Sequence, residues 1–382
     1  MKETDSFVTD VVSWEKFRKE ILNDATARQY LSDESGKCLK TDRISVADKP
    51  DRLRKGSPND YCSLASYWWP DPNKPDGLPY VRRDGETNPE HYETDRGRIV
   101  KLYDTVSCLV LQSYVTGSEI HARHAGRLLR CWFLDPETRM NPHLEYAQYI
   151  PGICEGRGIG LIDTGIFCQL LDAIMRLPFN DDWTRDDLKG FRKWMREYLN
   201  WFLESAHGKK ECSEFNNHGT WYDTQAVCFS LFCGDDEIAR RQIENFTFSR
   251  LKSQIEPDGS QPHELARTLS MSYCTFNLAA FAILAQLARK LDIDLWNWKS
   301  PDGRAILPAI RWMIPYYLGE KKWVHKQIHE FHQPLAIYLL SLAAQGTGNT
   351  EFSDAADKMS GHPWNRISLW QSGVRKYPDS SK

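Results

Sequence analysis

Apolar residues recur at every third or fourth position along most of this 382-residue chain. This spacing limits the possible folds more than any other feature, because it places apolar side chains on one face of an α-helix. It predicts helices over 8–21, 95–116, 119–133, 166–177, 184–205, 235–255, 276–291, 304–318 and 334–344. Another helix is expected to begin at Asn216, since Asn is a favoured N-cap and an apolar run follows. No convincing series of strands is present, so the sequence indicates an all-α protein.

The connections between the expected helices are alternately short and long. Ten or more helices joined mostly as pairs favour a closed ring of helical hairpins over a small bundle. The length would allow one domain or two. The long connections, 60–89 and 134–163, are rich in Pro and Gly, which is typical of loops.

The first long loop contains two adjacent tryptophans, Trp68 and Trp69, before Pro70. Two neighbouring rings in such a loop cannot both point into one core, so at least one is expected to be a surface platform or a plug. For either ring alone, packing beneath the loop is an equally good interpretation. The whole chain holds 14 Trp, 16 Tyr and 16 Phe, which favours a carbohydrate or another large polar ligand.

Charge and cysteine usage exclude several classes of protein. The net charge is −3, from 49 basic and 52 acidic residues, so no overall field attracts nucleic acid or an anionic membrane. No run of eighteen apolar residues predicts a membrane span. The ten cysteines stand singly, mostly in apolar runs, and are interpreted as small buried hydrophobes. The glycines of 156–160 lack the following Lys-Ser/Thr of a nucleotide-binding loop.

The segment 216–223 (NNHGTWYD) gathers amides, an imidazole, a phenol and a carboxylate within about two turns of chain. These groups donate hydrogen bonds or move protons, so the segment is a candidate for chemistry. The simpler interpretation is an Asn-capped helix that enters the core. The segment alone leaves both open.

Several longer motifs occur in a fixed order. They are 60–72 (DYCSLASYWWPDP), 77–85 (GLPYVRRDG), 132–142 (WFLDPETRMNP), 216–219 (NNHG), 258–260 (DGS) and 264–267 (ELAR). Together they resemble the alginate lyase family of polysaccharide lyases over roughly residues 45–345. The resemblance implies an (α/α) toroid, an incomplete barrel of helical hairpins with long cleft-lining loops, formed by 1–382 as a single domain. It also implies metal-independent β-elimination of uronate polymers. The chain is most similar to the glucuronan- and alginate-active branch, because Gly219 stands where the best-known alginate lyases have Ser.

The resemblance also implies the catalytic residues. Eliminating a 4-linked sugar requires removal of the weakly acidic C5 proton, so the adjacent carboxylate must be neutralised. The family pattern gives that role to Asn217, with Arg267 nearby for a carboxylate or a phenol. Tyr273 matches the residue that takes the proton and returns it to O4. His218 would orient the substrate or move a proton.

Other positions are expected to bind sugar. The resemblance and the aromatic loop together predict substrate contacts from Tyr67, Trp68, Trp69, Gln148, Arg157, Tyr222 and His329. A zinc site at His325, His329 and His332, with Glu330 nearby, is not favoured, because no further ligand motif accompanies them and Pro334 interrupts the pattern. No metal or cofactor is therefore predicted.

Two other classes of protein are alternatives to a lyase. A glycoside hydrolase needs a pair of carboxylates with separated pKa values, for which Glu264, Asp223 and Asp163 are available. A non-catalytic glycan-binding protein would keep the aromatic platforms and lack the proton-transfer groups. The expected partner in the lyase interpretation is an anionic uronate polysaccharide. The family resemblance implies a periplasmic or secreted location, although the N-terminus lacks the apolar core of a signal peptide.

Stereochemistry predicts which polymer is cleaved. D-Mannuronate and D-glucuronate share their configuration at C4 and C5, so the C5 proton and O4 lie on the same side and one residue can serve as base and acid. L-Guluronate is inverted at C5 and needs a base on the other face, for which His218 is the candidate. Glucuronan or mannuronate blocks are therefore expected to be preferred over guluronate blocks.

Overall fold

The structure is a computed structural model that describes residues 7–360. Helices dominate it, as the apolar spacing predicts. Its α-helices are α1 (Val11–Asn23), α2 (Ala25–Cys38), α3 (Glu90–Glu93), α4 (Asp95–Thr116), α5 (Glu119–Phe133), α6 (Phe167–Ile174), α7 (Arg185–Glu204), α8 (Ala206–Cys212), α9 (Asn217–Cys233), α10 (Asp236–Gln242), α11 (Phe248–Gln254), α12 (Pro262–Leu265), α13 (Ser270–Ala288), α14 (Ile306–Tyr317), α15 (Pro334–Thr347) and α16 (Thr350–Ser360).

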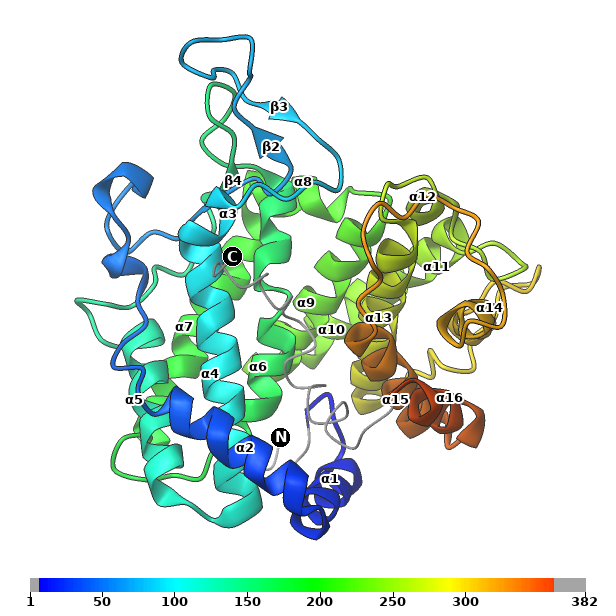
Figure 1. Cartoon of the computed structure of the whole chain (residues 1–382), viewed down its shortest axis with the longest axis horizontal. Helices are drawn as coiled ribbons and strands as arrows, with labels where there is room; N and C mark the ends of the chain where they lie inside the picture. Colours follow the sequence, from blue (N-terminus) through cyan, green and yellow to red (C-terminus); the bar gives the residue numbers. More distant parts are fainter. Residues whose placement is uncertain (1–6, 361–382) are drawn as a thin grey trace.

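The helices form the inner and outer layers of an incomplete (α/α) toroid (Figure 1). In the inner layer α4 packs on α6, α6 on α9, α9 on α13, and α13 on α15. Outer helices cover them: α2 and α5 lie on α4, α7 and α10 on α9, and α16 on α15. The all-α toroid is therefore confirmed. The closed ring expected from the number of helices is wrong, because the barrel stays open.

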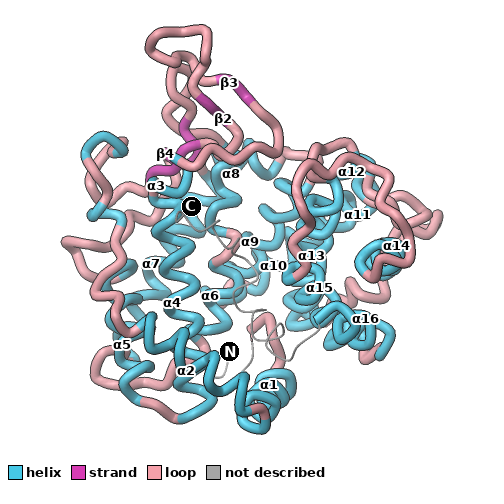
Figure 2. The backbone as a smooth tube through the Cα atoms, viewed as in Figure 1, coloured by secondary structure: helices cyan, strands magenta, loops and turns pink. Residues whose placement is uncertain are grey.

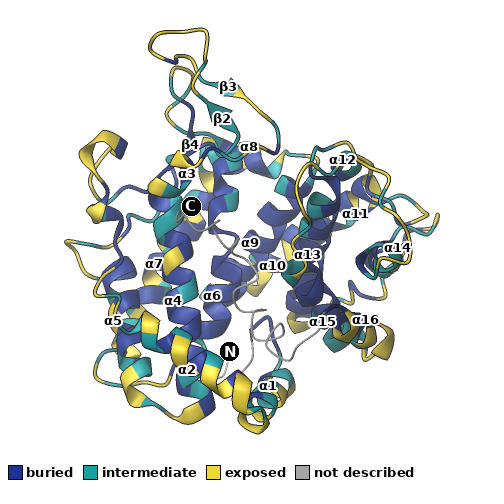
Figure 3. Cartoon of the chain, in the orientation of Figure 1, coloured by how far each residue is buried: buried dark blue, intermediate teal, exposed yellow. Residues whose placement is uncertain are grey.

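Two inner helices are buried along almost their whole length. α9 and α13 pack against neighbours on all sides, so neither has the single apolar face of an amphipathic helix (Figure 3), and α9 also buries polar side chains such as Thr220, Asp223 and Gln225. The segment Ser270–Leu291, which includes α13, is long and apolar enough to cross a membrane, but 83% of its apolar 18-residue window is buried inside the fold. Core packing therefore accounts for its composition.

Most predicted helix boundaries agree with the structure, and the exceptions are informative. The capping box at Thr184 and Asp187 opens α7, and Asn216 caps α9. α2 was missed, because it buries little besides Ala27 and Leu31 within a polar stretch. The helix predicted over 235–255 is divided by a π-helical turn. α13 begins six residues before the predicted 276–291, which places Tyr273 in its first turn.

Short strands, which the sequence did not show, support the long loops. β1 (Cys62–Leu64) pairs in parallel with β4 (Tyr146–Tyr149). β2 (Trp68–Trp69) pairs antiparallel with β3 (Val81–Arg82), and this hairpin projects beyond the helices (Figures 1 and 2). Trp68 lies opposite Arg82, and the amide of Arg83 donates to the carbonyl of Tyr67 over 2.8 Å. The two ends of the hairpin are thus tied together where it meets the helices.

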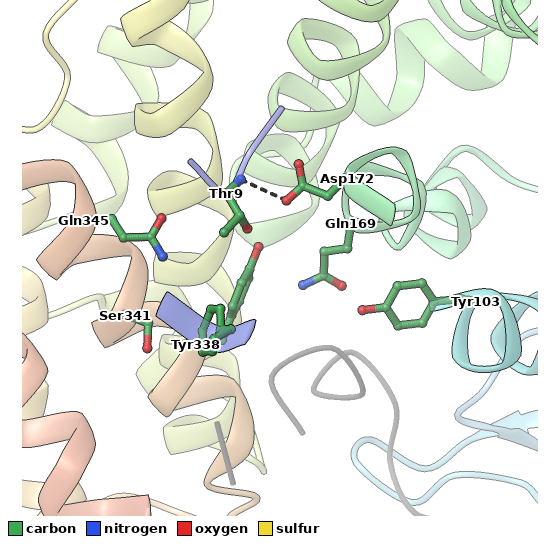
Figure 4. Close-up of a pocket in the computed structure, with 8 residues that line it drawn as sticks. Thr9, Tyr103, Gln169, Asp172, Tyr338, Ser341 and Gln345 are labelled. Atoms are coloured by element: carbon green, nitrogen blue, oxygen red, sulfur yellow. Dashed lines mark hydrogen bonds between the residues drawn. The ribbon is translucent and has the colours of Figure 1, made fainter. Parts of the chain in front are cut away.

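A small cavity of about 20 Å³ lies between α4, α6, α15 and the N-terminal segment (Figure 4). The carboxylate of Asp172 on α6 accepts the backbone amides of Val8 and Thr9 over 2.5 and 2.8 Å. Tyr103, Gln169 and Tyr338 also line this cavity. Its volume suits about one water molecule.

Candidate active site

Tyr273 stands where the projecting hairpin meets α13. Its hydroxyl lies 2.5 Å from the hydroxyl of Tyr67, the residue just before β2. The guanidinium carbon of Arg267 lies 3.8 Å from the centre of the Tyr273 ring. Burial and the neighbouring Tyr67 raise the pKa of Tyr273 well above its usual value, and the charge of Arg267 acts in the opposite direction.

Arg267 is held from the other end of the hairpin. Its Nη2 donates to Oδ1 of Asp84 over 2.8 Å, and its Nε lies 3.4 Å from Oδ2. The hydroxyl of Thr268 donates to the same carboxylate over 2.9 Å. Burial alone would raise the pKa of Asp84, but the hydrogen bonds from Arg267 and Thr268 lower it overall. Asp84 is therefore a firmly held anion.

Asn217, the first residue of α9, is fixed by a buried carboxylate. The backbone amide of Asn217 donates to Oε1 of Glu264 over 2.7 Å, and its side-chain Nδ2 donates to Oε2 over 2.8 Å. This pair of bonds sets which way the Asn217 amide faces. Its Oδ1 has no hydrogen-bond partner within residues 7–360. The amide of Arg267 donates to the carbonyl of Glu264 over 3.1 Å, which links Asn217 to the Tyr273 cluster.

His218 follows on the same helix and is oriented by a second buried acid. Its Nδ1 lies 2.8 Å from Oε1 of Glu211, whose side chain is fully buried. Burial raises the pKa of Glu211, although His218 opposes the shift. The imidazole itself is 17% exposed. Because Nδ1 is engaged by Glu211, Nε2 is the nitrogen available to a ligand.

Gln148 and Arg157 meet on the second long loop. Nη2 of Arg157 donates to Oε1 of Gln148 over 2.8 Å, and Nε2 of Gln148 lies 3.2 Å from Asp163. Gln148 has φ +51°, a left-handed conformation that is uncommon for such a residue and is often found at functional sites. Burial lowers the pKa of Arg157 to about 10. Its Nε has no hydrogen-bond partner within residues 7–360, and the carboxylates of Asp163 and Glu211 act on its charge.

Comparison with known proteins identifies the family of this chain. A family model described as "Alginate lyase" matches residues 45–323. The chain belongs to the alginate lyase family. It is a polysaccharide lyase, so the hydrolase and the non-catalytic binding protein are not retained.

Solved structures extend the likeness beyond the family model. The crystal structure of an alginate lyase from Bacteroides ovatus is 36% identical, with a TM-score of 0.89, over 96% of this chain and 98% of that one. Alginate lyase A1-III from a Sphingomonas species is 16% identical, with a TM-score of 0.52, over 84% of this chain and 87% of that one. A variant of A1-III complexed with a tetrasaccharide has the same identity and TM-score. A search of curated proteins gave no match.

The two tryptophans of this lyase are half-buried and belong to the hairpin. The indole N–H of Trp69 donates to the carbonyl of Glu86 over 2.9 Å, and the Arg83 guanidinium lies 5.1 Å from the centre of its ring. Trp69 therefore fastens the hairpin, while Trp68 lies in the same strand. Their roles as sugar platforms stay predictions. Tyr67 differs from both, because its hydroxyl contacts Tyr273.

The interpretation of Tyr222 as a substrate contact needs correction. Tyr222 is 3% exposed, and its ring stacks on Phe202 with centroids 4.7 Å apart and planes at 15°. It lies one turn into α9, where that helix is already surrounded by neighbours. The ring is a core side chain of the lyase fold.

The histidine segment is not a helix in this structure. The chain between α14 and α15 is a loop, so His325, His329 and His332 do not share a helical face. Within residues 7–360 no three His, Cys, Asp or Glu side chains gather to hold a metal ion. His329 is exposed, and the adjacent Gln327 bonds to Met271 and Ser272 at the start of α13. His329 therefore stands beside the turn that carries Tyr273.

The carboxylates considered for a hydrolase have structural partners instead. Asp223 accepts bonds from Gln242, Thr247 and Arg250 and is fully buried. Asp163 is 2% exposed and accepts bonds from Tyr61, Ser63 and Gln148. Glu264 holds Asn217.

Gly219 has a local explanation. A Cβ atom at this position would collide with Nη1 of Arg250 and with the carbonyl of Glu214. Arg250 is fixed there by its ion pair with Asp223 over 2.8 Å. The space that a Ser side chain would need is therefore filled by the core of this lyase.

Two residues of this site, Asp84 and Glu211, are not among those predicted from the sequence. Asp84 lies within a quoted motif, 77–85, but nothing local shows that it contacts Arg267, 183 positions away. Glu211 sits seven residues before His218, in a short polar helix. The only sequence signal for Glu211 was an acidic residue a few positions before a histidine.

Proposed function

We propose that this lyase cleaves 1,4-linked uronate polymers, glucuronan or mannuronate-rich alginate, by metal-independent β-elimination. The products would carry a 4,5-unsaturated uronate at the new non-reducing end. The observation that carries the proposal is the Tyr273 phenol with the Arg267 cation against its ring and the Tyr67 hydroxyl at 2.5 Å. This arrangement supplies a proton-transfer group together with neighbours able to stabilise its ionised form.

The first requirement of the reaction is neutralisation of the uronate carboxylate at the scissile residue. Nδ2 of Asn217 donates one hydrogen to Glu264, which fixes the amide, and its second hydrogen would be offered to the uronate carboxylate. A donor placed where charge develops typically contributes a few kcal/mol to transition-state stabilisation. Arg157 offers a guanidinium whose Nε has no hydrogen-bond partner within residues 7–360, which suits a carboxylate of the polymer. These donors make a metal ion unnecessary for this step.

The second requirement is removal of the C5 proton. Tyr273 in its phenolate form would take the proton, and its hydroxyl would then return it to O4 as the C4–O4 bond breaks. The positive charge of Arg267 favours the phenolate, and Tyr67 can donate a hydrogen bond to it. Returning the proton to O4 regenerates the phenolate, so only enzyme with ionised Tyr273 enters the cycle, and activity should rise with pH on the acid side of its optimum.

His218 has a separate position and a separate role. Glu211 fixes its Nδ1, so Nε2 would face the substrate. For polymers in which the C5 proton and O4 share a side, His218 would orient the sugar beside Asn217. For L-guluronate it is the available base for the opposite face.

The substrate preference follows from this division. One group, Tyr273, can complete both proton transfers on D-mannuronate and on D-glucuronate, because both share their configuration at C4 and C5. We therefore expect faster cleavage of these polymers than of polyguluronate. Initial rates of ultraviolet-absorbing unsaturated product on pure glucuronan, polymannuronate and polyguluronate test this directly. A clear preference for polyguluronate contradicts syn elimination by Tyr273.

A further inference from the structure

Asp84 is placed where the second end of the hairpin meets the catalytic cluster. Register fixes this position, because β3 ends at Arg82 and the Arg83 amide is bonded to the Tyr67 carbonyl. The hairpin thus sends one side chain from each end into the site: Tyr67 to the Tyr273 hydroxyl and Asp84 to Arg267. The proposed chemistry uses Tyr67 but gives no role to Asp84.

The contacts of Asp84 determine how Arg267 can be used. A guanidinium is a planar fork that can bind a carboxylate through its edge or an aromatic ring through its face. In this structure Asp84 takes the edge formed by Nε and Nη2, while the face lies 3.8 Å from the Tyr273 ring centre. Arg267 is 18% exposed and Asp84 24% exposed, so solvent screens this pair only in part.

We propose that Asp84 is a positioning residue for the base: it fixes Arg267 flat against Tyr273 and keeps the bound edge of the guanidinium from the uronate carboxylate. Arg267 then serves Tyr273, and neutralising the substrate falls to Asn217 and Arg157. This inference rests on the proposed role of Tyr273.

The charged and titratable groups that act on Tyr273 come from two segments. The hairpin contributes Tyr67 and Asp84, and the turn before α13 contributes Arg267. The loop between α14 and α15 is bonded to Ser270 through the Lys326 carbonyl, and its Lys326 and His329 side chains are exposed. Of these groups, Arg267 lies on the ring face, so its position is expected to control how easily the phenol ionises.

Double-mutant cycles test whether Asp84 acts through Arg267. Asp84→Asn keeps the size of the side chain and an acceptor for Thr268, and it removes the charge that anchors the guanidinium. We expect kcat to fall about tenfold or more, with KM changed less, and the acid limb of the kcat profile to move up by about one pH unit. The kcat of the double variant Asp84→Asn with Arg267→Ala should be within about twofold of the kcat of Arg267→Ala alone, because both substitutions remove the same interaction.

Matched variants separate this role from simple fastening of the hairpin. Asp76→Asn, an exposed carboxylate on the same loop, should leave kcat and the pH profile unchanged. In the double variant Asp84→Asn with Tyr67→Phe, the fold-decreases in kcat of the two single variants should multiply. If Asp84 only fastened the hairpin, the fall in kcat from Asp84→Asn would not add to the fall from Tyr67→Phe. It would instead multiply with the fall in kcat from Arg267→Ala, and that result would overturn the proposal.

The pH profile supplies an independent readout. A carboxylate acting only through its own charge raises the pKa of a nearby phenol, so its removal would move the acid limb down. A downward shift, or none, in Asp84→Asn therefore contradicts positioning through Arg267. Tyr273→Phe distinguishes failure of the proposed function from failure of this inference. Full activity of Tyr273→Phe would contradict both the proposed function and the role of Asp84. If Tyr273→Phe is inactive but the falls in kcat from Asp84→Asn and Arg267→Ala multiply in the double variant, only the role of Asp84 is contradicted.

Discussion

The hydroxyl oxygens of Tyr67 and Tyr273 lie 2.5 Å apart, although 206 positions separate the two residues. Tyr67 belongs to a loop that leaves the toroid, and Tyr273 to the first turn of the buried helix α13. The candidate active site of this alginate lyase family member therefore brings together residues of the hairpin and of the end of α13.

Tyr67→Phe should lower kcat by about tenfold to a hundredfold, because it removes one hydrogen bond to a group that carries charge during the reaction. The ring itself is kept, so packing should change little. Steady-state kinetics on the preferred polymer provide the measurement. Tyr80→Phe is the control, since Tyr80 is on the same loop and its hydroxyl bonds to Glu90 over 3.3 Å. Equal kinetics for wild type and Tyr67→Phe would remove Tyr67 from the mechanism.

Asn217→Ala should reduce kcat roughly a hundredfold or more, the usual scale for loss of one charge-stabilising donor. Asn216→Ser is the matched neighbour, because Ser also caps a helix and preserves the start of α9. Thermal unfolding of both variants separates loss of chemistry from loss of fold. An Asn217→Ala enzyme as fast as Asn216→Ser would move carboxylate neutralisation to another residue.

Some of this site is visible in the sequence, and some is not. The bounds of α4 and α5 follow from regular apolar spacing. Asn217 and His218 follow from a local motif, and their proposed roles stay predictions. The contact of Asp84 with Arg267 depends on how the hairpin lies on the helices, which no local pattern reports. Tyr222 was misassigned because the motif does not show that α9 is enclosed on every side. The periplasmic or secreted location and the single domain also stay predictions.

Activity should survive exhaustive treatment with a chelator, because Asn217 and Arg157 can neutralise the substrate carboxylate without an ion. Initial rates before and after treatment with EDTA, followed by gel filtration, provide the measurement. Loss of activity that one divalent ion restores would contradict metal independence. His325 and His329 would then be candidate metal ligands.

Asp172→Asn should flatten the dependence of stability on pH in mild acid. Burial raises the pKa of Asp172 from 3.8 to about 6, against the bonds from Thr9 and Val8. A raised folded-state pKa gives stability that is fully present below about 4 and is lost as the pH rises through about 6. The difference is on the order of 3 kcal/mol. Urea unfolding of wild type and Asp172→Asn between pH 4 and 7 measures it. Parallel stability curves would show that Asp172 does not titrate in this range.

The most direct test of the account is the rate at which Tyr273→Phe forms unsaturated uronate from the preferred polymer, measured by ultraviolet absorbance. Phe keeps the ring beneath Arg267 and removes the one hydroxyl that the account uses as base and acid. We predict no turnover above background, with the fold and binding of the polymer retained. A Tyr273→Phe enzyme that keeps more than a small fraction of the wild-type kcat would contradict the assignment of Tyr273.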